Sequence, residues 1–404
     1  MGKFLNKIKH IPWLISRLSI IIIFLHLTAK TVATKLLYGS LLGDASMHTL
    51  IIQLLLTNQK ITLTAKPLYE NYHLLYPLGS HILAIYSLLL IGIPIHRIII
   101  IQQFFLLLLT FLAMDFLSQS LFRRCVRYKY LLSSLLLIIF GFTQYPYHAI
   151  GWGGMPFQTG LAFLVFALGF LHLLFLEKCR CEINIRKEQT MKCIIISLII
   201  STCLYTYFLA MVFIALWFLI LLGFNILRYR EIKNNLVFTL QVVLFSFLSS
   251  VKFFIEIWIA LYILPPYGVE GGLGLPITTS LRAYTIFNFD IWNIHDHTEF
   301  LGLYGLLSFL AILPLILSFI YPCVKVLPHF LGIKIGLDDS FRSFLNNMFL
   351  VSLLYVLVYL YVRYISANVY IRGLPLLAYV NLQKIFFFLD VIVSILTLYL
   401  SLIH

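Results

Sequence analysis

The sequence predicts an all-α integral membrane protein with about 11 membrane-spanning helices in a single domain, residues 1–404. Hydrophobic residues make up 61% of the chain and charged residues only 11%, whereas soluble domains carry about 25% charged residues. Apolar runs of roughly 20 residues, the length that crosses a bilayer as a helix, recur from end to end. The runs are too long for barrel strands, and backbone groups in lipid must be satisfied within each segment, so helices follow.

The charge distribution sets the predicted orientation. The net charge of +14 does not indicate nucleic acid, because Lys and Arg gather in the cytoplasmic loops of membrane proteins. Lys3, Lys7 and Lys9 place the N-terminus in the cytoplasm and make 12–34 the first span, running outward. This run is long and has no clear small-residue cleavage site after it, so it is predicted to be a span and not a cleaved leader. The predicted location is the cell membrane, as a multi-pass protein.

The apolar stretch 78–95 is ambiguous. If it crossed the membrane, the basic cluster from Arg123 to Lys129 would fall outside, against the positive-inside tendency. If it lies along the outer surface, that cluster falls inside and the later loops agree. The stretch is short and is interrupted by Gly92 and Pro94. The juxtamembrane alternative is therefore favoured.

The remaining predicted spans alternate in direction. Inward spans are 98–120, 158–176, 208–227, 303–322 and 370–383, and outward spans are 130–146, 193–207, 236–264, 344–362 and 385–403. Two long loops, 35–97 and 265–302, then lie outside. Long loops in compact proteins are usually functional. The functional face is therefore predicted to be the outer one.

An acid and a histidine, Asp44 and His48, follow the first span and lie one helical turn apart. If a helix starts near Asp44, the two share one face. Charge is costly near lipid, which favours Asp44 as a catalytic general base, with His48 orienting it or contacting substrate. Asp is also a favoured N-cap before an apolar run. The two interpretations are compatible, and both stay open.

Further candidate substrate-binding residues lie in the outer loops. Tyr and His side chains offer directional hydrogen bonds and apolar faces, which suit a sugar. Each histidine could instead simply pack at the interface. No paired-ligand spacing such as His-x-x-x-His occurs, so no cofactor is predicted and a divalent metal is only the alternative. The residues concerned are His73, Tyr76, His81, His148, Trp152 and Glu299.

Charged residues near or within later spans add two hypotheses. Arg363 and Arg372 lie at the outer ends of two spans, where guanidinium groups could bind a phosphate; snorkelling to the interface is the alternative. Lys252 and Glu256, four residues apart in one span, are interpreted as a neutralising pair, or as a contact to an anionic lipid head.

The chain resembles the GT-C superfamily of integral-membrane glycosyltransferases, which includes protein O-mannosyltransferases and the aminoarabinose transferases of lipid A. The similarity lies in an acid just beyond an outward first span and in two motifs like those of little-characterised prokaryotic members. These are Asp44-x-x-x-His48 and His73-x-x-Tyr76-Pro77-x-Gly79-x-His81. The run from Arg372 to Ala378 is similar to an arginine-plus-proline helix near the end of many members.

This resemblance implies a polyprenyl-phosphate-linked sugar as donor and Asp44 as base or acceptor-orienting residue. It also implies that 78–95 is a juxtamembrane helix. The chain lacks the paired acids Asp-x-Asp or Glu-x-Asp, which puts metal dependence in doubt. It lacks the Trp-Trp-Asp-Tyr-Gly motif, which argues against an oligosaccharyltransferase.

The leading hypothesis is an inverting glycosyltransferase of hexosyltransferase type, acting on a lipid, glycan or protein acceptor at the outer face. A transporter or flippase of a lipid-linked sugar is the alternative, because Asp115, Lys252 and Glu256 are ionisable residues within spans. A non-catalytic membrane assembly subunit is a third interpretation.

Overall fold

A computed structural model describes much of the chain as long helices. The described residues are 2–36, 44–59, 78–124, 128–143, 154–177, 186–207, 209–229, 232–252, 254–255, 316–317, 320, 339–360 and 391–399. Within these ranges the regular structure is helical and contains no strand, which confirms the predicted all-α class. The helices are α1 (Gly2–Leu36), α2 (Asp44–Asn58), α3 (Gly79–Ile91), α4 (Ile95–Leu121), α5 (Lys129–Gly141), α7 (Met155–Glu177), α8 (Arg186–Thr206), α9 (Leu209–Tyr229), α10 (Ile232–Ser249) and α15 (Asp339–Leu360).

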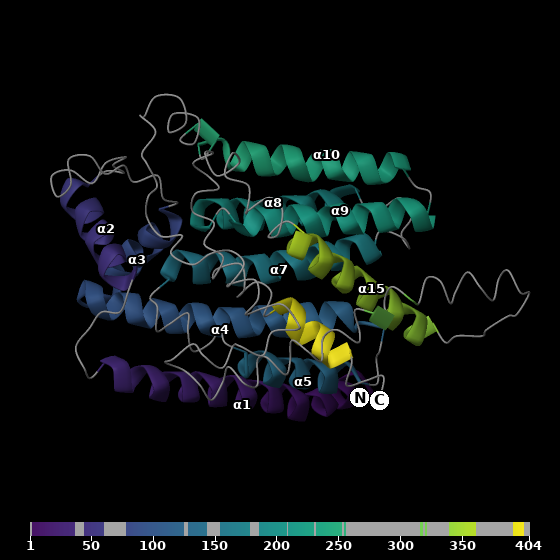
Figure 1. Ribbon diagram of the computed structural model, residues 1–404, viewed down its shortest axis with the longest axis horizontal. Coiled ribbons are helices and arrows are strands. Elements are labelled where there is room, and N and C mark those ends of the chain that lie inside the picture. Colours follow the sequence, from purple (N-terminus) through teal and green to yellow (C-terminus); the bar gives the residue numbers. More distant parts are fainter. Residues whose placement is uncertain are drawn as a thin grey trace, which may run out of the picture.

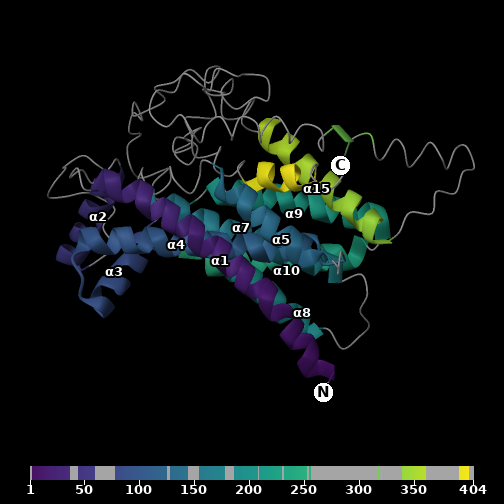
Figure 2. The ribbon, with the colours of Figure 1, turned by 90° about the horizontal axis from the view of Figure 1, so that it is seen from below.

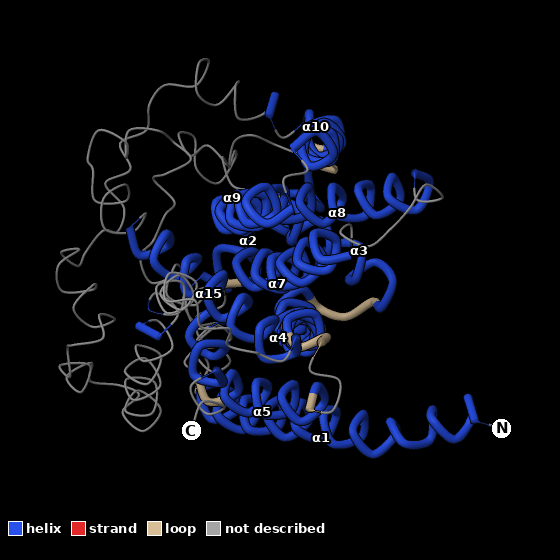
Figure 3. The backbone as a smooth tube through the Cα atoms, turned by 90° about the vertical axis from the view of Figure 1, so that its right-hand side faces the viewer, coloured by secondary structure: helices blue, strands red, loops and turns tan. Residues whose placement is uncertain are grey.

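The long helices lie side by side as a bundle, with α1 at one edge and α10 at the other (Figure 1). The view along the helices in Figure 3 shows α4 and α7 between these edges. Within the described ranges, three helical stretches are long and apolar enough to cross a membrane, namely Trp13–Lys30, Arg97–Leu121 and Met155–Phe175. Shorter apolar stretches in α5, α8, α9, α10 and α15 accompany them. The chain is a membrane protein built from apolar helices.

Contacts between helices give their relative directions. Ser120 on α4 contacts His172 on α7, and Leu117 lies beside Gly169, so α4 and α7 run in parallel. Arg17 on α1 pairs with Asp115 on α4, while Phe24, further along α1, stacks on Phe111, so these two helices are antiparallel. Both relations agree with the predicted spans.

The last described helical segment, 391–399, differs from the prediction. Ile392 lies deep in the bundle beside Leu117 and Leu168. Tyr399 packs on Phe122, at the C-terminal end of α4, and on Phe344. The segment therefore runs parallel to α4, whereas an outward span at 385–403 would run antiparallel to it. The positive-inside rule could not predict the direction of this segment, because residues 391–399 include no charged side chain.

Apolar residues cover the free faces of the edge helices. On α1, Ile22 is 62% exposed, and on α10, Leu240 is 59% exposed. In water such faces would be unfavourable, but in a bilayer they contact lipid chains at no such cost. The outer helices of the bundle thus carry the composition that a lipid environment requires.

Helix α3 is a short apolar helix. Its 13 residues rise about 20 Å, against roughly 30 Å of hydrocarbon. The helix ends at Gly92, whose φ of 69° is left-handed and whose N–H donates to the Leu88 carbonyl at 2.8 Å. Pro94 is the N-cap that precedes α4. The structure thus places a short helix and a sharp turn within 78–95, as the Gly92–Pro94 interruption predicts, and the juxtamembrane position of this helix stays a prediction.

Candidate functional site

Helices α2 and α3 lie together at one end of the bundle, here called the α2–α3 end (Figures 1 and 2). On α2, Ile51, Leu54 and Leu55 pack against Ile85 of α3. The neighbouring Ile52 packs with Ala84 of α3 and with the first turns of α4 and α7, through Ile98, Ile99 and Met155. Apolar packing therefore fixes α2 and α3 over the ends of α4 and α7.

The first turn of α3 approaches the end of α8 very closely. A Cβ added to Gly79 would lie 2.7 Å from the Tyr205 carbonyl oxygen. Since a backbone oxygen cannot easily move aside, a glycine is needed for this approach. The glycine in the motif that suggested the family resemblance thus has a structural role.

Two predicted site histidines meet between α2 and α3. His48 Nδ1 and His81 Nε2 lie 3.0 Å apart, so one ring donates a hydrogen bond to the other. His48 is 4% exposed and His81 is fully buried. Their rings meet edge to face, with centroids 5.0 Å apart. The contact joins two segments that the sequence separates by 33 positions.

The environment keeps His81 neutral. Burial, and then the neighbouring His48, lower the pKa of His81 well below its usual 6.5. A neutral imidazole offers one donor and one acceptor nitrogen. His81 can therefore act as a neutral donor or acceptor toward a hydroxyl group.

Asp44 is the first residue of α2. The sequence predicts that Asp44 and His48 share one helix face if a helix starts near Asp44, and α2 starts there. The two positions therefore lie one turn apart on one face of α2. Asp44 also lies at the N-terminus of α2, where a carboxylate interacts favourably with the helix dipole. Both predicted roles of Asp44 remain compatible with this position.

The structure brings together only part of the predicted site. His48 and His81 are adjacent, and Asp44 starts the same helix as His48. The other predicted residues lie outside the described part of the chain: His73, Tyr76, His148, Trp152, Glu299, Arg363 and Arg372. Among the described residues, no three His, Cys, Asp or Glu side chains are grouped so that they could hold a metal ion.

The sequence-based interpretation missed buried polar residues around the same end. Gln102 on α4 donates from Nε2 to the Ser80 carbonyl at 3.1 Å, which ties α4 to α3. Gln102, Gln103 and Gln158 are each at least 95% buried. The signal was present in the sequence, since amides that open otherwise apolar runs need hydrogen-bond partners in lipid.

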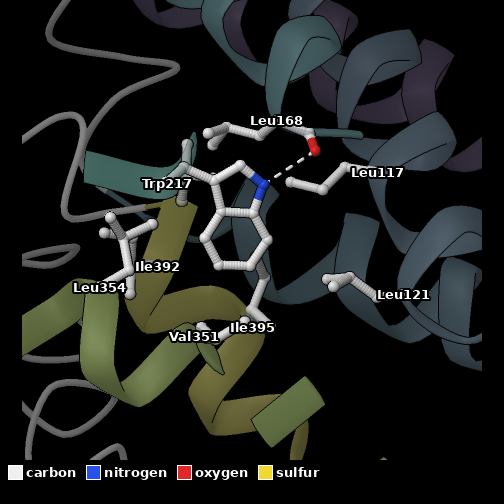
Figure 4. A pocket seen from close by; sticks show the side chains of 9 residues that line it. Leu117, Leu121, Leu168, Trp217, Val351, Leu354, Ile392 and Ile395 are labelled. Atoms are coloured by element: carbon white, nitrogen blue, oxygen red, sulfur yellow. Dashed lines mark hydrogen bonds between the residues drawn. The ribbon is translucent and has the colours of Figure 1, made fainter. Parts of the chain in front are cut away.

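A small apolar pocket lies elsewhere, nearer the opposite end of the bundle (Figure 4). Trp217 lines it, and its Nε1 donates to the Leu168 carbonyl at 3.0 Å. The other lining residues are aliphatic: Leu117, Leu121, Leu168, Val351, Leu354, Val391, Ile392 and Ile395. This pocket offers no group for acid–base chemistry, so the α2–α3 end is the better candidate site.

Comparison with known proteins gives a fold relationship. No protein-family profile matches the chain, and no curated protein sequence matches it. Among solved structures, it is similar to the archaeal oligosaccharyltransferase AglB from Archaeoglobus fulgidus, solved in complex with an inhibitory peptide and a dolichol-phosphate. The TM-score is 0.58 at 12% identity, over 96% of this chain and 50% of AglB. The chain therefore spans about half the length of that enzyme and shares its fold.

Proposed function

We propose that this protein is an inverting membrane glycosyltransferase of hexosyltransferase type that transfers a sugar from a polyprenyl-phosphate carrier to an acceptor hydroxyl at the outer face. The fold likeness to AglB, a glycosyltransferase solved with a dolichol-phosphate, carries the proposal. The position of Asp44 at the start of α2, one turn from the buried His48–His81 contact, supports it.

In this proposal Asp44 accepts the proton of the acceptor hydroxyl. The acceptor oxygen forms a bond to the anomeric carbon as the bond from that carbon to the phosphate oxygen breaks. Because attack occurs on the face opposite the leaving group, the configuration inverts. The polyprenyl phosphate leaves with the bonding electrons, and Arg363 or Arg372 stabilises its charge.

The other predicted residues shape the sugar and acceptor sites. His48 and His81 position hydroxyl groups by hydrogen bonding, His81 as a neutral ring. His73, Tyr76, His148, Trp152 and Glu299 contact the sugar or the acceptor. The acceptor is a lipid, a glycan or a protein. A divalent metal is not assigned a step.

The test is Asp44→Asn in membranes supplied with a labelled polyprenyl-phosphate sugar. Asn caps a helix about as well as Asp, so the variant keeps the structural role and loses the base. We expect transfer to fall by about 10²–10⁴-fold with unchanged thermal stability. Glu231→Gln, a matched change in a loop predicted to be cytoplasmic, should transfer normally.

Normal transfer by folded Asp44→Asn would refute the base assignment. Movement of the labelled lipid across the membrane without any transfer product, in the wild-type protein, would instead favour the transporter or flippase alternative.

A further inference from the structure

Three glutamine side chains are buried where α4 and α7 begin. Gln102 is 5% exposed, Gln103 is 3% exposed and Gln158 is fully buried. Ser80, in the first turn of α3, is also fully buried. These four polar side chains, here called the amide cluster, lie on α3, α4 and α7, the helices that also contribute Ala84, Leu106 and Met155 to one buried apolar cluster.

Most of the hydrogen-bonding atoms in the amide cluster are unused. Within the part of the chain that the structure describes, neither amide atom of Gln158 has a partner, nor do Gln103 Nε2, Gln102 Oε1 and Ser80 Oγ. Buried polar groups are nearly always paired in native proteins, because desolvating them without a hydrogen bond is costly. Several such atoms at one end of the bundle indicate that something outside the described chain satisfies them.

The packing of α4 against α7 places the members of the cluster near one another. A Cβ on Gly169 would lie 3.3 Å from the Leu117 Cα, so the two helices approach closely. Gln158 precedes Gly169 by about three turns, and so shares its face of α7. Since α4 and α7 run in parallel, the first turn of α7, which carries Met155 and Gln158, lies level with Gln103 and Leu106 of α4.

The chemistry of the cluster selects an uncharged, hydroxyl-rich ligand. Amides and a serine hydroxyl each offer both donors and acceptors, as sugar hydroxyls do. A phosphate would instead favour guanidinium or ammonium groups, and the amide cluster contains neither. The nearby His81 is neutral for the reason given above.

We propose that Gln103, Gln158 and Ser80 form the floor of a subsite that hydrogen-bonds the sugar of the lipid-linked donor. The inference rests on the proposed function. It assigns to these three residues the task of distinguishing a lipid phosphate that carries a sugar from one that does not.

Binding of two lipids to the full chain in nanodiscs tests the inference. The probes are decaprenyl phosphate and decaprenyl-phosphate hexoses carrying glucose, galactose or mannose. Wild type should bind at least one hexose-bearing lipid about tenfold more tightly than decaprenyl phosphate, which corresponds to a few good hydrogen bonds. Gln158→Leu should reduce this ratio to near one while leaving the affinity for decaprenyl phosphate unchanged.

Two further variants make the test robust. Ser80→Ala removes a single oxygen and should lower the same ratio by a few fold if Gln158→Leu does not fold. Gln241→Leu on α10, whose amide accepts a weak bond from Cys193, is the matched control and should leave the ratio unchanged. Replacement of an unpaired buried amide by an apolar side chain should not lower stability, so a Gln158→Leu protein that melts much earlier than wild type indicates a structural amide and overturns the inference.

The outcomes separate this inference from the proposed function. If wild type discriminates between the lipids and folded Gln158→Leu discriminates equally well, the inference fails and the proposed function stands. If wild type binds neither kind of lipid, the proposed function fails and the inference fails with it.

Discussion

Arg17 on α1 donates from Nη1 to both carboxylate oxygens of Asp115 on α4, each at 2.8 Å. Gln119 Nε2 also donates to Asp115, at 2.7 Å, and the Ser133 hydroxyl of α5 donates to the same carboxylate. The Arg17 guanidinium stacks over the Tyr130 ring. Asp115 is thus held in a network that joins three helices.

This network changes the interpretation of Asp115. As an ionisable residue within a span, it had supported the transporter alternative. In the structure it is 17% exposed and neutralised by Arg17, which is 7% exposed. A carboxylate with these partners has a structural role. Glu256, which was expected to pair with Lys252, lies outside the described residues.

Removing one partner of this pair should destabilise the protein strongly. We expect Arg17→Met to lower the free energy of unfolding by about 3–5 kcal/mol, because an unpaired buried carboxylate remains. The double variant Arg17→Met/Asp115→Leu should recover most of the loss. Unfolding by SDS in mixed micelles measures both. A loss below about 1 kcal/mol in Arg17→Met would show that the pair contributes little.

Stability should depend on pH through His81. Its pKa is lowered in the folded protein, so the unfolded chain binds the proton more readily. The contribution of neutral His81 to the free energy of unfolding is fully present above about pH 6.5, the pKa of histidine in the unfolded chain. This contribution is lost as the pH falls from there toward the lower pKa of His81 in the folded protein. The melting temperature should therefore fall as the pH is lowered from about 7.5 to about 5.

The variant His81→Phe should reduce the slope of this pH profile, because it removes one buried titrating ring. His26→Gln, at an exposed position of α1, serves as the control and should keep the wild-type profile. A slope that persists unchanged in His81→Phe would assign the pH dependence to other groups.

Two glycines in the bundle should respond in opposite ways to alanine. A Cβ on Gly160 would lie 2.4 Å from the Tyr207 Cβ, whereas a Cβ on Gly223 has no neighbour within 4 Å. Overpacking should cost Gly160→Ala about 1–3 kcal/mol. Gly223→Ala should be neutral or stabilising by up to about 1 kcal/mol, because Ala is the better helix former. Equal melting temperatures for the two variants would contradict the close contact between α7 and Tyr207.

Asn347 joins α15 to the bundle. Its Nδ2 donates to the Leu121 carbonyl, and its Oδ1 lies 3.1 Å from His172 Nε2. Asn347→Ala should cost about 1–3 kcal/mol, because it leaves buried groups on α4 and α7 unpaired. The adjacent Asn346→Ala, at a half-buried position, should change stability by less than about 0.5 kcal/mol. If the two variants unfold alike, the hydrogen bonds of Asn347 are unimportant.

Local patterns predicted much of the architecture. Apolar run length predicted the helices that contain Arg97–Leu121 and Met155–Phe175, and the Gly92–Pro94 interruption predicted the break between α3 and α4. The reversed direction of 391–399 was not predictable, because an uncharged apolar segment satisfies the membrane equally well in either direction.

The sequence by itself determined that this is an all-α membrane protein and that Asp44 and His48 lie one turn apart. These properties depend on hydrophobicity and on the helical repeat, which are local. Only the tertiary structure decided that His48 meets His81, that Asp115 is neutralised by Arg17 and that the amide cluster is buried at the α2–α3 end. Such contacts join residues far apart in the chain, and they depend on which helix faces pack together, which local patterns do not specify.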